Sequence, residues 1–495
     1  MSLAIIHSRS KQGIDAPAIT IEVHLSNGLP SLSIVGMPET AVKESRERVR
    51  SALLNAHFDF PPRRITINLA PADIPKEGSR YDLAIALGIL AASGQLPAEH
   101  LGDYEFVAEL ALNGELRAVD GLLPTAIACG RAGRKLVIAD GNRDEAALAH
   151  HTTVLPARHL LEVCAHLRGA APLDVQPGGV PDSPVEHHLD MADVIGQHQA
   201  RRALEVAAAG GHNLLFSGPP GTGKTLLASR LPTIMPPLGE EDALEVASIY
   251  SVAGLGLRRP FHQPPFRAPH HTASAAALVG GGGVPRPGEI SLAHRGVLFL
   301  DELPEFPRRV LEVLREPLES GEIHLSRAQA RIRYPSRFQL IAAMNPCPCG
   351  YLGSEKCRCT PDLVRRYRER ISGPLLDRID IQLQVRPIPQ RELIRAEGGG
   401  EASARVRQRV MAARQRQLDR QGKVNAALGA DDIRQHCALG ATEQQLLEMA
   451  IERMGLSARG YHRVLKVART IADLANSDGL NATHLGEALG YRFAR

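Results

Sequence analysis

The first third of the chain alternates apolar and polar residues in the manner of half-buried β-strands. Apolar side chains occupy every second position over 18–25, which predicts a strand with one face against a core. Other segments repeat the strand pattern or have helical spacing, namely strands at 32–35 and 65–69 and helices at 42–56 and 81–93. Residues 1–170 are therefore expected to form a mixed α/β domain.

Two more domains are expected beyond this one. Residues 171–188 contain four Pro and two Gly, which is the composition of a linker. A module with several short apolar strands follows over 189–389. The remainder, 390–495, has helical spacing and predicts a helical domain. At 495 residues the chain is also too long for a single hydrophobic core.

A short apolar strand at 214–217 runs into a glycine-rich loop and then into an apolar helix start. This order indicates a P-loop, in which backbone N–H groups converge on phosphate oxygens at a helix N-terminus. Its lysine reaches the β- and γ-phosphates, and the next hydroxyl binds Mg²⁺. The residues expected to bind the nucleotide are Gly218, Pro219, Pro220, Gly221, Thr222, Gly223, Lys224 and Thr225.

Two later apolar strands also end in polar residues. The strand at 297–300 ends at Asp301 and Glu302, where the first carboxylate suits the Mg²⁺ shell and the second suits polarisation of the attacking water. The strand at 339–344 ends at Asn345, which suits a role in positioning that water beside the γ-phosphate. Together with the P-loop, these residues predict an ATP hydrolase that uses Mg²⁺.

Four of the seven cysteines lie close together in two Cys-x-Cys pairs, Cys347 with Cys349 and Cys357 with Cys359. Four thiolates suit one tetrahedral Zn²⁺, and a closed site of this kind is structural rather than catalytic. Reduced thiols, a redox disulfide and an iron–sulfur cluster are the alternatives. We expect a zinc-binding insertion over 345–360.

Composition restricts the class of protein without choosing a function. Hydrophobic content of 44% and charged content of 23% are ordinary for a soluble globular protein. No apolar run is long enough to span a bilayer and the N-terminus lacks a secretion signal, so a cytoplasmic protein without membrane association is expected. The net charge is only +4, and the predominance of Arg over Lys reflects either a GC-rich genome or phosphate contact.

Longer strings of residues carry a family resemblance. The chain resembles the ComM/YifB family of magnesium-chelatase-like AAA+ proteins over nearly its whole length. The strings that carry it are Phe-Arg-Ala-Pro-His-His-Thr-Ala-Ser at 266–274, Pro-Gly-Glu-Ile-Ser-Leu-Ala-His-Arg-Gly at 287–296, Asp-Glu-Leu-Pro-Glu-Phe at 301–306 and Ile-Ser-Gly-Pro-Leu-Leu-Asp-Arg at 371–378. The resemblance implies an α/β multidomain fold with an AAA+ P-loop ATPase core and a helical C-terminal lid.

One arginine is implied to act on a neighbouring subunit. Arg378 ends a string that resembles the arginine-finger motif of the chelatase and replicative-helicase branch of AAA+ proteins. An arginine supplied in trans stabilises the charge of the transition state, so hydrolysis would need a ring. The alternative is a surface ion pair between Arg378 and either Asp377 or Asp380.

Further roles follow from the same resemblance. Asn345 takes the sensor-1 position, and residues 456–474 resemble a sensor-2 helix with Arg459 as the first choice for a phosphate contact and Arg463 as the second. The family resemblance implies a homohexameric DNA motor that drives branch migration and helps to integrate single-stranded DNA during natural transformation. Single-stranded and branched DNA are the implied partners, with recombination proteins as further candidates.

Loops inserted into the ATPase core face the ring pore in this branch of AAA+ proteins. The corresponding segments here are 270–287 and 321–336. The second has a hairpin-like pattern, and closely spaced arginines on a hairpin suit a phosphate backbone. A solvated hairpin face is the alternative. The candidates for DNA contact are Arg327, Arg331 and Arg333.

The N-terminal domain resembles the Lon protease domain, which has a ribosomal S5 domain 2-like fold. Residues 75–83 resemble its serine segment and 113–123 its lysine segment. In this alignment Arg80 stands at the position of the nucleophile and Leu123 at that of the general base. A serine–lysine dyad needs a hydroxyl and an amine in hydrogen-bonding reach. We therefore expect a Lon-like fold without the protease dyad.

Four functions compete on these residues. An ATP-driven DNA translocase or branch-migration helicase leads. A metal-chelatase motor subunit shares the ATPase core, but the N-terminal domain and the cysteine cluster argue against it. An ATP-dependent protease is opposed by Arg80 and Leu123. A remodelling chaperone that acts on protein partners stays open.

Overall fold

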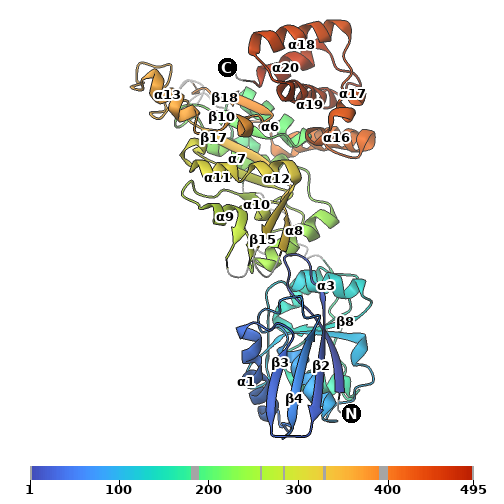
Figure 1. Cartoon of the computed structure of the whole chain (residues 1–495). Helices are drawn as coiled ribbons and strands as arrows, with labels where there is room; N and C mark the ends of the chain where they lie inside the picture. The colour runs from blue at the N-terminus through green and yellow to red at the C-terminus, as the bar shows by residue number, and fades with distance from the viewer. Residues whose placement is uncertain are drawn as a thin grey trace.

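The computed structural model describes residues 3–179, 189–256, 259–282, 285–326, 331–388 and 400–492, without the side chains of residues 326 and 331. The strands of the N-terminal sheet lie at one end of the molecule, the C-terminal helices at the other, and a second sheet between them (Figure 1). Among the residues described, no helix is both long and apolar enough to cross a membrane.

The N-terminal part is built on a seven-stranded mixed sheet in the order β3-β4-β2-β1-β5-β8-β9. Strand β2 is antiparallel to β1 and β4, whereas β1, β5, β8 and β9 run parallel. The strands are β1 (Leu3–Arg9), β2 (Ala18–Ser26), β3 (Ser31–Val35), β4 (Arg64–Ala70), β5 (Tyr104–Val107), β6 (Glu109–Leu110), β7 (Leu116–Arg117), β8 (Lys135–Ala139) and β9 (Val154–Ala157). The helices are α1 (Thr40–Asn55), α2 (Asp82–Ala92), η1 (Leu101–Asp103), α3 (Leu122–Arg131), η2 (Asp140–Asn142), α4 (Arg143–Ala147) and α5 (Leu160–Leu167).

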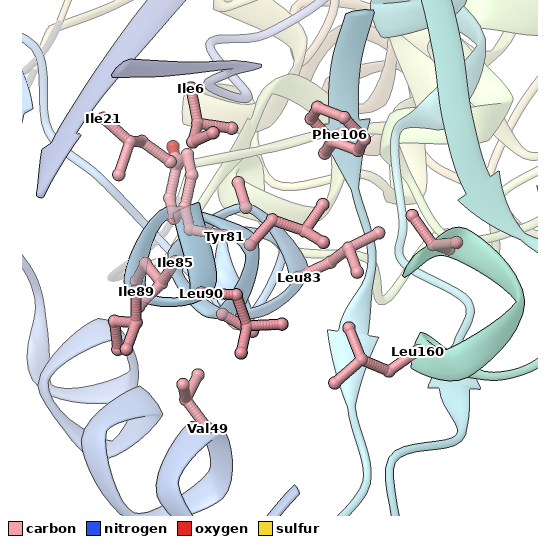
Figure 2. Close-up of a cluster of buried hydrophobic side chains, with 14 of the residues drawn as sticks. Ile6, Ile21, Val49, Tyr81, Leu83, Ile85, Ile89, Leu90, Phe106 and Leu160 are labelled. Atoms are coloured by element: carbon pink, nitrogen blue, oxygen red, sulfur yellow. The ribbon is translucent and has the colours of Figure 1, made fainter. Parts of the chain in front are cut away.

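Helix α2 forms the centre of the N-terminal core. All of its residues are buried, as expected of a helix that is apolar all round. Ile85 and Ile89 of this helix belong to the same buried cluster as Ile6 and Ile21 of the sheet and Val49 of α1 (Figure 2). The mixed α/β character predicted for this part of the chain is confirmed.

The first half of the predicted linker packs back onto the N-terminal part. The N–H of Gln176 donates to the carbonyl of Val154 in β9 at 2.9 Å, and the N–H of Gly179 donates to the carbonyl of Ala147 at 3.0 Å. The other half, 180–188, lies outside the described residues. Proline and glycine content therefore marks the end of the regular elements, but not the point where the chain leaves the N-terminal part.

The central part contains a five-stranded parallel sheet in the order β11-β14-β17-β10-β18. Its strands are β10 (Leu214–Ser217), β11 (Phe266–Arg267), β14 (Val297–Leu300), β17 (Gln339–Met344) and β18 (Ile381–Gln384), and two hairpins add β12 (Gly280–Gly281), β13 (Arg286–Pro287), β15 (Glu322–Ser326) and β16 (Arg331–Pro335). The helices are η3 (Met191–Asp193), α6 (His198–Gly210), α7 (Lys224–Ile234), α8 (Glu240–Val252), α9 (Ala275–Val279), α10 (Glu289–Leu292), η4 (Leu303–Glu305), α11 (Arg308–Glu312), α12 (Arg315–Ser320), α13 (Pro361–Arg368) and α14 (Gly373–Leu376).

The C-terminal region is helical, as the sequence predicted. Its elements are α16 (Ser403–Gln421), η5 (Asn425–Ala427), α17 (Ala430–His436), α18 (Ala441–Met454), α19 (Ala458–Leu474) and α20 (Ala482–Gly490). Helix α6 of the central part contacts both α16 and α19. Apolar residues of all three helices join one buried cluster with those of the central sheet, so the helical region is fixed to the sheet through α6.

The N-terminal and central parts share an apolar junction. Leu123 of α3 belongs to one buried cluster with Val246 of α8. Gly13, in the loop between β1 and β2, lies against strand β16 of the β15–β16 hairpin, because a Cβ on this glycine would come within 2.7 Å of Cγ2 of Ile332. The N-terminal part therefore touches both α8 and this hairpin.

Candidate functional site

The glycine-rich loop follows β10 and ends at the first residue of α7. Gly221 and Gly223 have φ values of 75° and 83°, in the left-handed region that favours glycine. Gly218 also has no room for a side chain, since a Cβ would lie 2.3 Å from the carbonyl oxygen of Val385. The loop thus has the tight backbone and the adjoining helix N-terminus that phosphate binding requires.

Lys224, the first residue of α7, folds back over this loop. Its ammonium donates to the carbonyls of Gly218 and Pro219 at 2.7 and 2.9 Å and to Oδ1 of Asn345 at 3.2 Å. Burial lowers the pKa of Lys224, and the carboxylates of Asp301 and Glu302 oppose this shift. A buried ammonium with only neutral acceptors as hydrogen-bond partners is well prepared to bind a phosphate oxygen.

The hydroxyl of Thr225 meets the first carboxylate at the end of β14. Thr225 Oγ1 donates to Oδ2 of Asp301 at 2.6 Å. A hydroxyl and a carboxylate oxygen side by side suit Mg²⁺, which takes a few protein oxygens and completes its octahedron with water and phosphate. The second acid, Glu302, has a φ of 51°, and its N–H donates to Oδ1 of Asp301 at 2.9 Å.

Glu302 has a partner that sequence reasoning missed. Its carboxylate lies 3.2 Å from Nδ1 of His271, in the segment between β11 and α9. The adjacent histidines at 270 and 271 were the available signal for this partner. They lie in one of the strings that carry the family resemblance, but their residue type alone did not assign them a role. His271 is therefore placed to orient the carboxylate that follows Asp301.

The order of the strands explains why these residues meet. Strand β17 lies between β10 and β14, and all three run parallel, so their carboxyl ends share one edge of the sheet. Asn345 follows β17 at this edge, while the N–H of Gly218 donates to the carbonyl of Met344 at 3.2 Å. The structure therefore brings together Lys224, Thr225, Asp301, Glu302 and Asn345.

Arg378 lies apart from this group in the contacts that the structure describes. It is buried, forms an ion pair with Glu319 of α12 and donates to the carbonyl of Pro374 at 2.7 Å. Asp380 instead pairs with Arg463 and lies 3.4 Å from Nδ1 of His212. Glu319 is thus the partner that spacing along the sequence did not reveal, since it lies on a different helix.

Arg459 and Arg463, the two arginines of α19 that were expected to contact phosphate, have different surroundings. Arg459 is exposed in the first turn of the helix, whereas Arg463 is engaged by Asp380. Burial disfavours ionisation of Asp380, but the adjacent imidazole of His212 and the charge of Arg463 prevail and hold its pKa well below the usual range. Of the two, Arg459 is the one free to approach a phosphate in this conformation.

A cavity of about 650 Å³ separates the central sheet from the helical region. Ser217, Met344 and Gln384, at the carboxyl ends of three strands, line one side. Met454 and Ser457, just before α19, line the other. Ligands of open α/β sheets bind at this edge, so the cavity adjoins the P-loop where a nucleotide would extend toward the helical region.

The four clustered cysteines converge in space. Their sulfur atoms all lie within 4.8 Å of one another, and the closest three pairs are 3.4, 3.7 and 4.0 Å apart. Zn–S bonds of about 2.3 Å in a tetrahedron place sulfurs roughly 3.8 Å apart. Backbone N–H groups of Tyr351 and Arg358 lower the pKa of Cys349 to about 6. The arrangement of Cys347, Cys349, Cys357 and Cys359 therefore fits one tetrahedral metal ion.

The predicted hairpin is present as β15 and β16, which pair antiparallel. The side chain of Arg333 is 62% exposed and lies 3.1 Å from Glu322 on the opposite strand. Arg327 and the side chain of Arg331 lie outside the described part of the chain. Arg333 is consequently the one DNA-contact candidate whose surroundings the structure describes.

The two residues expected at the dyad positions have different surroundings. Arg80 is buried and donates to the carbonyl of Asp120 at 2.6 Å, within the N-terminal part. Leu123 is buried in α3, where its N–H donates to Glu145 at 3.1 Å and to Oγ of Ser251 in α8 at 3.3 Å. Leu123 therefore contacts the central part, whereas the hydrogen-bond partners that the structure describes for Arg80 belong to the N-terminal part.

The parallel sheet, the P-loop edge and the helical C-terminal region define a magnesium-chelatase-like AAA+ protein. Family models described as magnesium chelatase subunit ChlI, subunit ChlI of Mg-chelatase and the ChlI C-terminal region match residues 190–393, 21–142 and 400–492. Within that class, the chain belongs to the ComM/YifB family. Membership implies ATPase activity and the use of ATP and Mg²⁺.

Two relatives match along nearly the whole chain, and a third matches part of it. Protein YifB of Escherichia coli is 53% identical, covering 99% of this chain and 97% of the relative. Competence protein ComM of Haemophilus influenzae is also 53% identical, covering 99% and 98%. The magnesium-chelatase 38 kDa subunit of Cereibacter sphaeroides is 26% identical and covers 61% of this chain and 91% of its own.

Proposed function

We propose that this chain is one protomer of a homohexameric ATP-driven DNA motor, a branch-migration helicase that promotes integration of single-stranded DNA in homologous recombination during natural transformation. The observation that carries the proposal is the convergence of Lys224, Thr225, Asp301, Glu302 and Asn345 at one sheet edge, in a chain 53% identical over its length to a competence protein. The proposed place of action is the cytoplasm.

Hydrolysis follows from the roles these groups suit. Lys224 neutralises the β- and γ-phosphates, and Thr225 and Asp301 hold the Mg²⁺ shell. Glu302, oriented by His271 at 3.2 Å, polarises the attacking water, and Asn345 positions that water. These assignments rest on side chains already in hydrogen-bonding reach of one another.

The remaining charge is supplied across a subunit boundary. Arg378 leaves Glu319 and reaches the γ-phosphate of the neighbouring protomer, while Arg459 supplies a further phosphate contact and Arg463 is the second choice. The support for this proposal is that Arg378 has no described contact with residues 218–225 of its own chain. Each protomer then contributes half of each catalytic site.

Contact with DNA is assigned to the β15–β16 hairpin, with Arg327, Arg331 and Arg333 as its cationic side chains. The exposed Arg333 gives up little when it leaves Glu322, because exposed ion pairs contribute at most about 1 kcal/mol. A cationic hairpin then binds the phosphate backbone without reading sequence, as a motor that moves along DNA requires.

DNA binding is expected to weaken in Arg333→Ala. Because one phosphate contact is lost, the slope of log affinity against log salt should fall by about 1. Fluorescence anisotropy with labelled single-stranded and forked DNA, at several salt concentrations, measures both. Arg365→Ala is the control, since this side chain is 66% exposed on α13 and pairs with Asp362. An unchanged slope in Arg333→Ala removes the hairpin from the DNA interface.

The cysteine cluster is assigned to one structural Zn²⁺ in an insertion over 345–360. Protein purified under reducing conditions is expected to hold about one zinc per chain by elemental analysis. The double variant Cys357→Ser/Cys359→Ser should lose it, whereas Cys129→Ala, a buried thiol of α3, should retain it. Iron with inorganic sulfide indicates a cluster instead, and protein free of metal refutes the site.

The N-terminal part is proposed to be a Lon-like domain over 1–170, without peptidase activity, followed by a linker, an AAA+ core over 189–389 and a lid over 390–495. Ser79 binds Glu109 rather than a lysine. With Arg80 buried and Leu123 hydrogen-bonded to Ser251 of α8, the domain serves ring assembly or guidance of DNA.

A chelatase motor subunit or a remodelling chaperone is the alternative function. The family models carry the chelatase description, and a chelatase subunit is related at 26% identity. These functions share ATP hydrolysis but not its response to nucleic acid. Hydrolysis that ignores single-stranded and branched DNA, together with no salt-dependent binding, favours the alternatives over the DNA motor.

A further inference from the structure

The loop that joins the two cysteine pairs lies against the P-loop. Gly350 is buried with a φ of 83°, and its N–H donates to the carbonyl of Cys347 at 2.9 Å. A Cβ on Gly350 would come 2.6 and 2.7 Å from Cδ and Cγ of Pro220, and 3.9 Å from Cγ of Asn345. The backbone of this loop is therefore in direct contact with the nucleotide-binding loop.

A second connection runs from the far side of the cluster. Tyr367 of α13, which follows the last cysteine, is buried and hydrogen-bonds with the backbone of Asn345. Asn345 in turn accepts the hydrogen bond from Lys224 at 3.2 Å. Asn345 lies just before the first of the four cysteines, and Tyr367 lies after the last one. Both sides of the cysteine cluster are thus connected to Asn345, the residue that accepts the hydrogen bond from Lys224.

The loop between the pairs has little to hold its shape without a bound ion. Residues 351–356 are all exposed, including Tyr351 and Leu352. A segment that buries so little apolar surface cannot offset the entropy of ordering its backbone. Ligation of one metal ion by four thiolates would hold the two ends of this loop together, much as a covalent cross-link does. The position of Gly350 against Pro220 is then expected to depend on the metal.

We propose that the four-cysteine metal site braces the P-loop through Gly350 and Pro220, so that metal and nucleotide bind cooperatively. The proposal rests on the nucleotide site described above and adds a positioning role for Gly350. Linkage requires the effect to be reciprocal: metal raises the affinity for nucleotide, and nucleotide raises the affinity for metal by the same factor.

Two glycines of the same loop provide a matched test. Gly350 and Gly353 have φ values of 83° and 86°, so alanine strains the backbone equally at both, but a Cβ at Gly353 meets nothing within 4 Å. Gly350→Ala is expected to weaken binding of a fluorescent ADP analogue by roughly tenfold, within the usual range of coupling. Gly353→Ala should bind as the wild type does, with zinc content measured for both. Equal affinities in the two variants overturn the proposal.

The zinc affinity of the protein supplies a readout that needs no variant at the contact. The zinc affinity of wild-type protein, measured by equilibrium competition with a chromophoric chelator, is expected to rise several-fold when Mg²⁺ and ADP are added. Lys224→Ala should show no such effect. An unchanged zinc affinity in wild-type protein that binds ADP overturns the brace while leaving the ATPase intact. Wild-type protein that fails to bind ADP refutes the proposed nucleotide site instead.

Discussion

Lys224→Ala should lose nucleotide binding by about 100-fold or more and show no measurable hydrolysis. The residue is 8% exposed, and its ammonium is surrounded by the carbonyls of Gly218 and Pro219 and by Asn345. Removing one partner of a desolvated charge pair costs about 3 kcal/mol or more, which is the stated factor. Titration with a fluorescent ATP analogue and a phosphate-release assay measure the two quantities.

The control for this change is a lysine outside the P-loop whose ammonium also has a polar partner. Lys423 lies 2.6 Å from Asp432 in the helical region and is 42% exposed, so Lys423→Ala removes an ammonium without touching the P-loop. Thermal unfolding of both variants separates loss of binding from loss of fold. Turnover retained by Lys224→Ala shows that the loop at 218–225 is not the catalytic P-loop.

Arg378→Ala should abolish hydrolysis by a factor of about 10³ or more while ATP binding persists. In the proposed ring, the arginine stabilises transition-state charge only after it has exchanged Glu319 for a phosphate on the next protomer. We therefore expect nucleotide binding to depend on Lys224 and its neighbours, and turnover to depend on assembly of the ring. Steady-state hydrolysis and equilibrium binding of a non-hydrolysable analogue are the measurements.

Mixing two inactive variants tests whether Arg378 acts in trans. Glu302→Gln keeps its arginine but lacks the carboxylate, and Arg378→Ala keeps the carboxylate but lacks the arginine. In a mixed ring, some boundaries join an intact P-loop site to an intact arginine, so part of the activity should return. Mixtures that stay inactive, although they co-assemble by light scattering, speak against the shared site. Arg365→Ala mixed with Glu302→Gln is the control for dilution.

Sequence alone anticipated the site where local pattern sets the geometry. The P-loop is a continuous strand, loop and helix, so the position of Lys224 follows from neighbouring residues. Asp301 and Asn345 follow apolar strands, and parallel strands bring their carboxyl ends to one edge. The α/β character of the N-terminal part and the helical C-terminal region followed from local periodicity, and membership of the ComM/YifB family followed from the longer strings that carry the resemblance, such as residues 266–274.

Pairings between distant elements were not accessible in this way. Glu319 lies 59 positions before Arg378 and Asp380 lies 83 positions before Arg463, and no periodicity links such residues. The contact of Gly350 with Pro220 depends on the backbone conformation of two separate loops. The course of residues 171–179 along β9 likewise depends on backbone hydrogen bonds to Val154 and Ala147, which composition does not encode.

The contact of Gly13 with Ile332 limits how the β15–β16 hairpin can move relative to the N-terminal sheet. Because a Cβ on Gly13 would come within 2.7 Å of Ile332, the β1–β2 loop and strand β16 are in direct contact. In the proposed motor, a movement of the hairpin must therefore either carry the N-terminal sheet with it or break this contact. In the first case the N-terminal sheet moves with the hairpin as one body. A fluorophore placed at the far end of this sheet would then report each movement of the hairpin as a displacement.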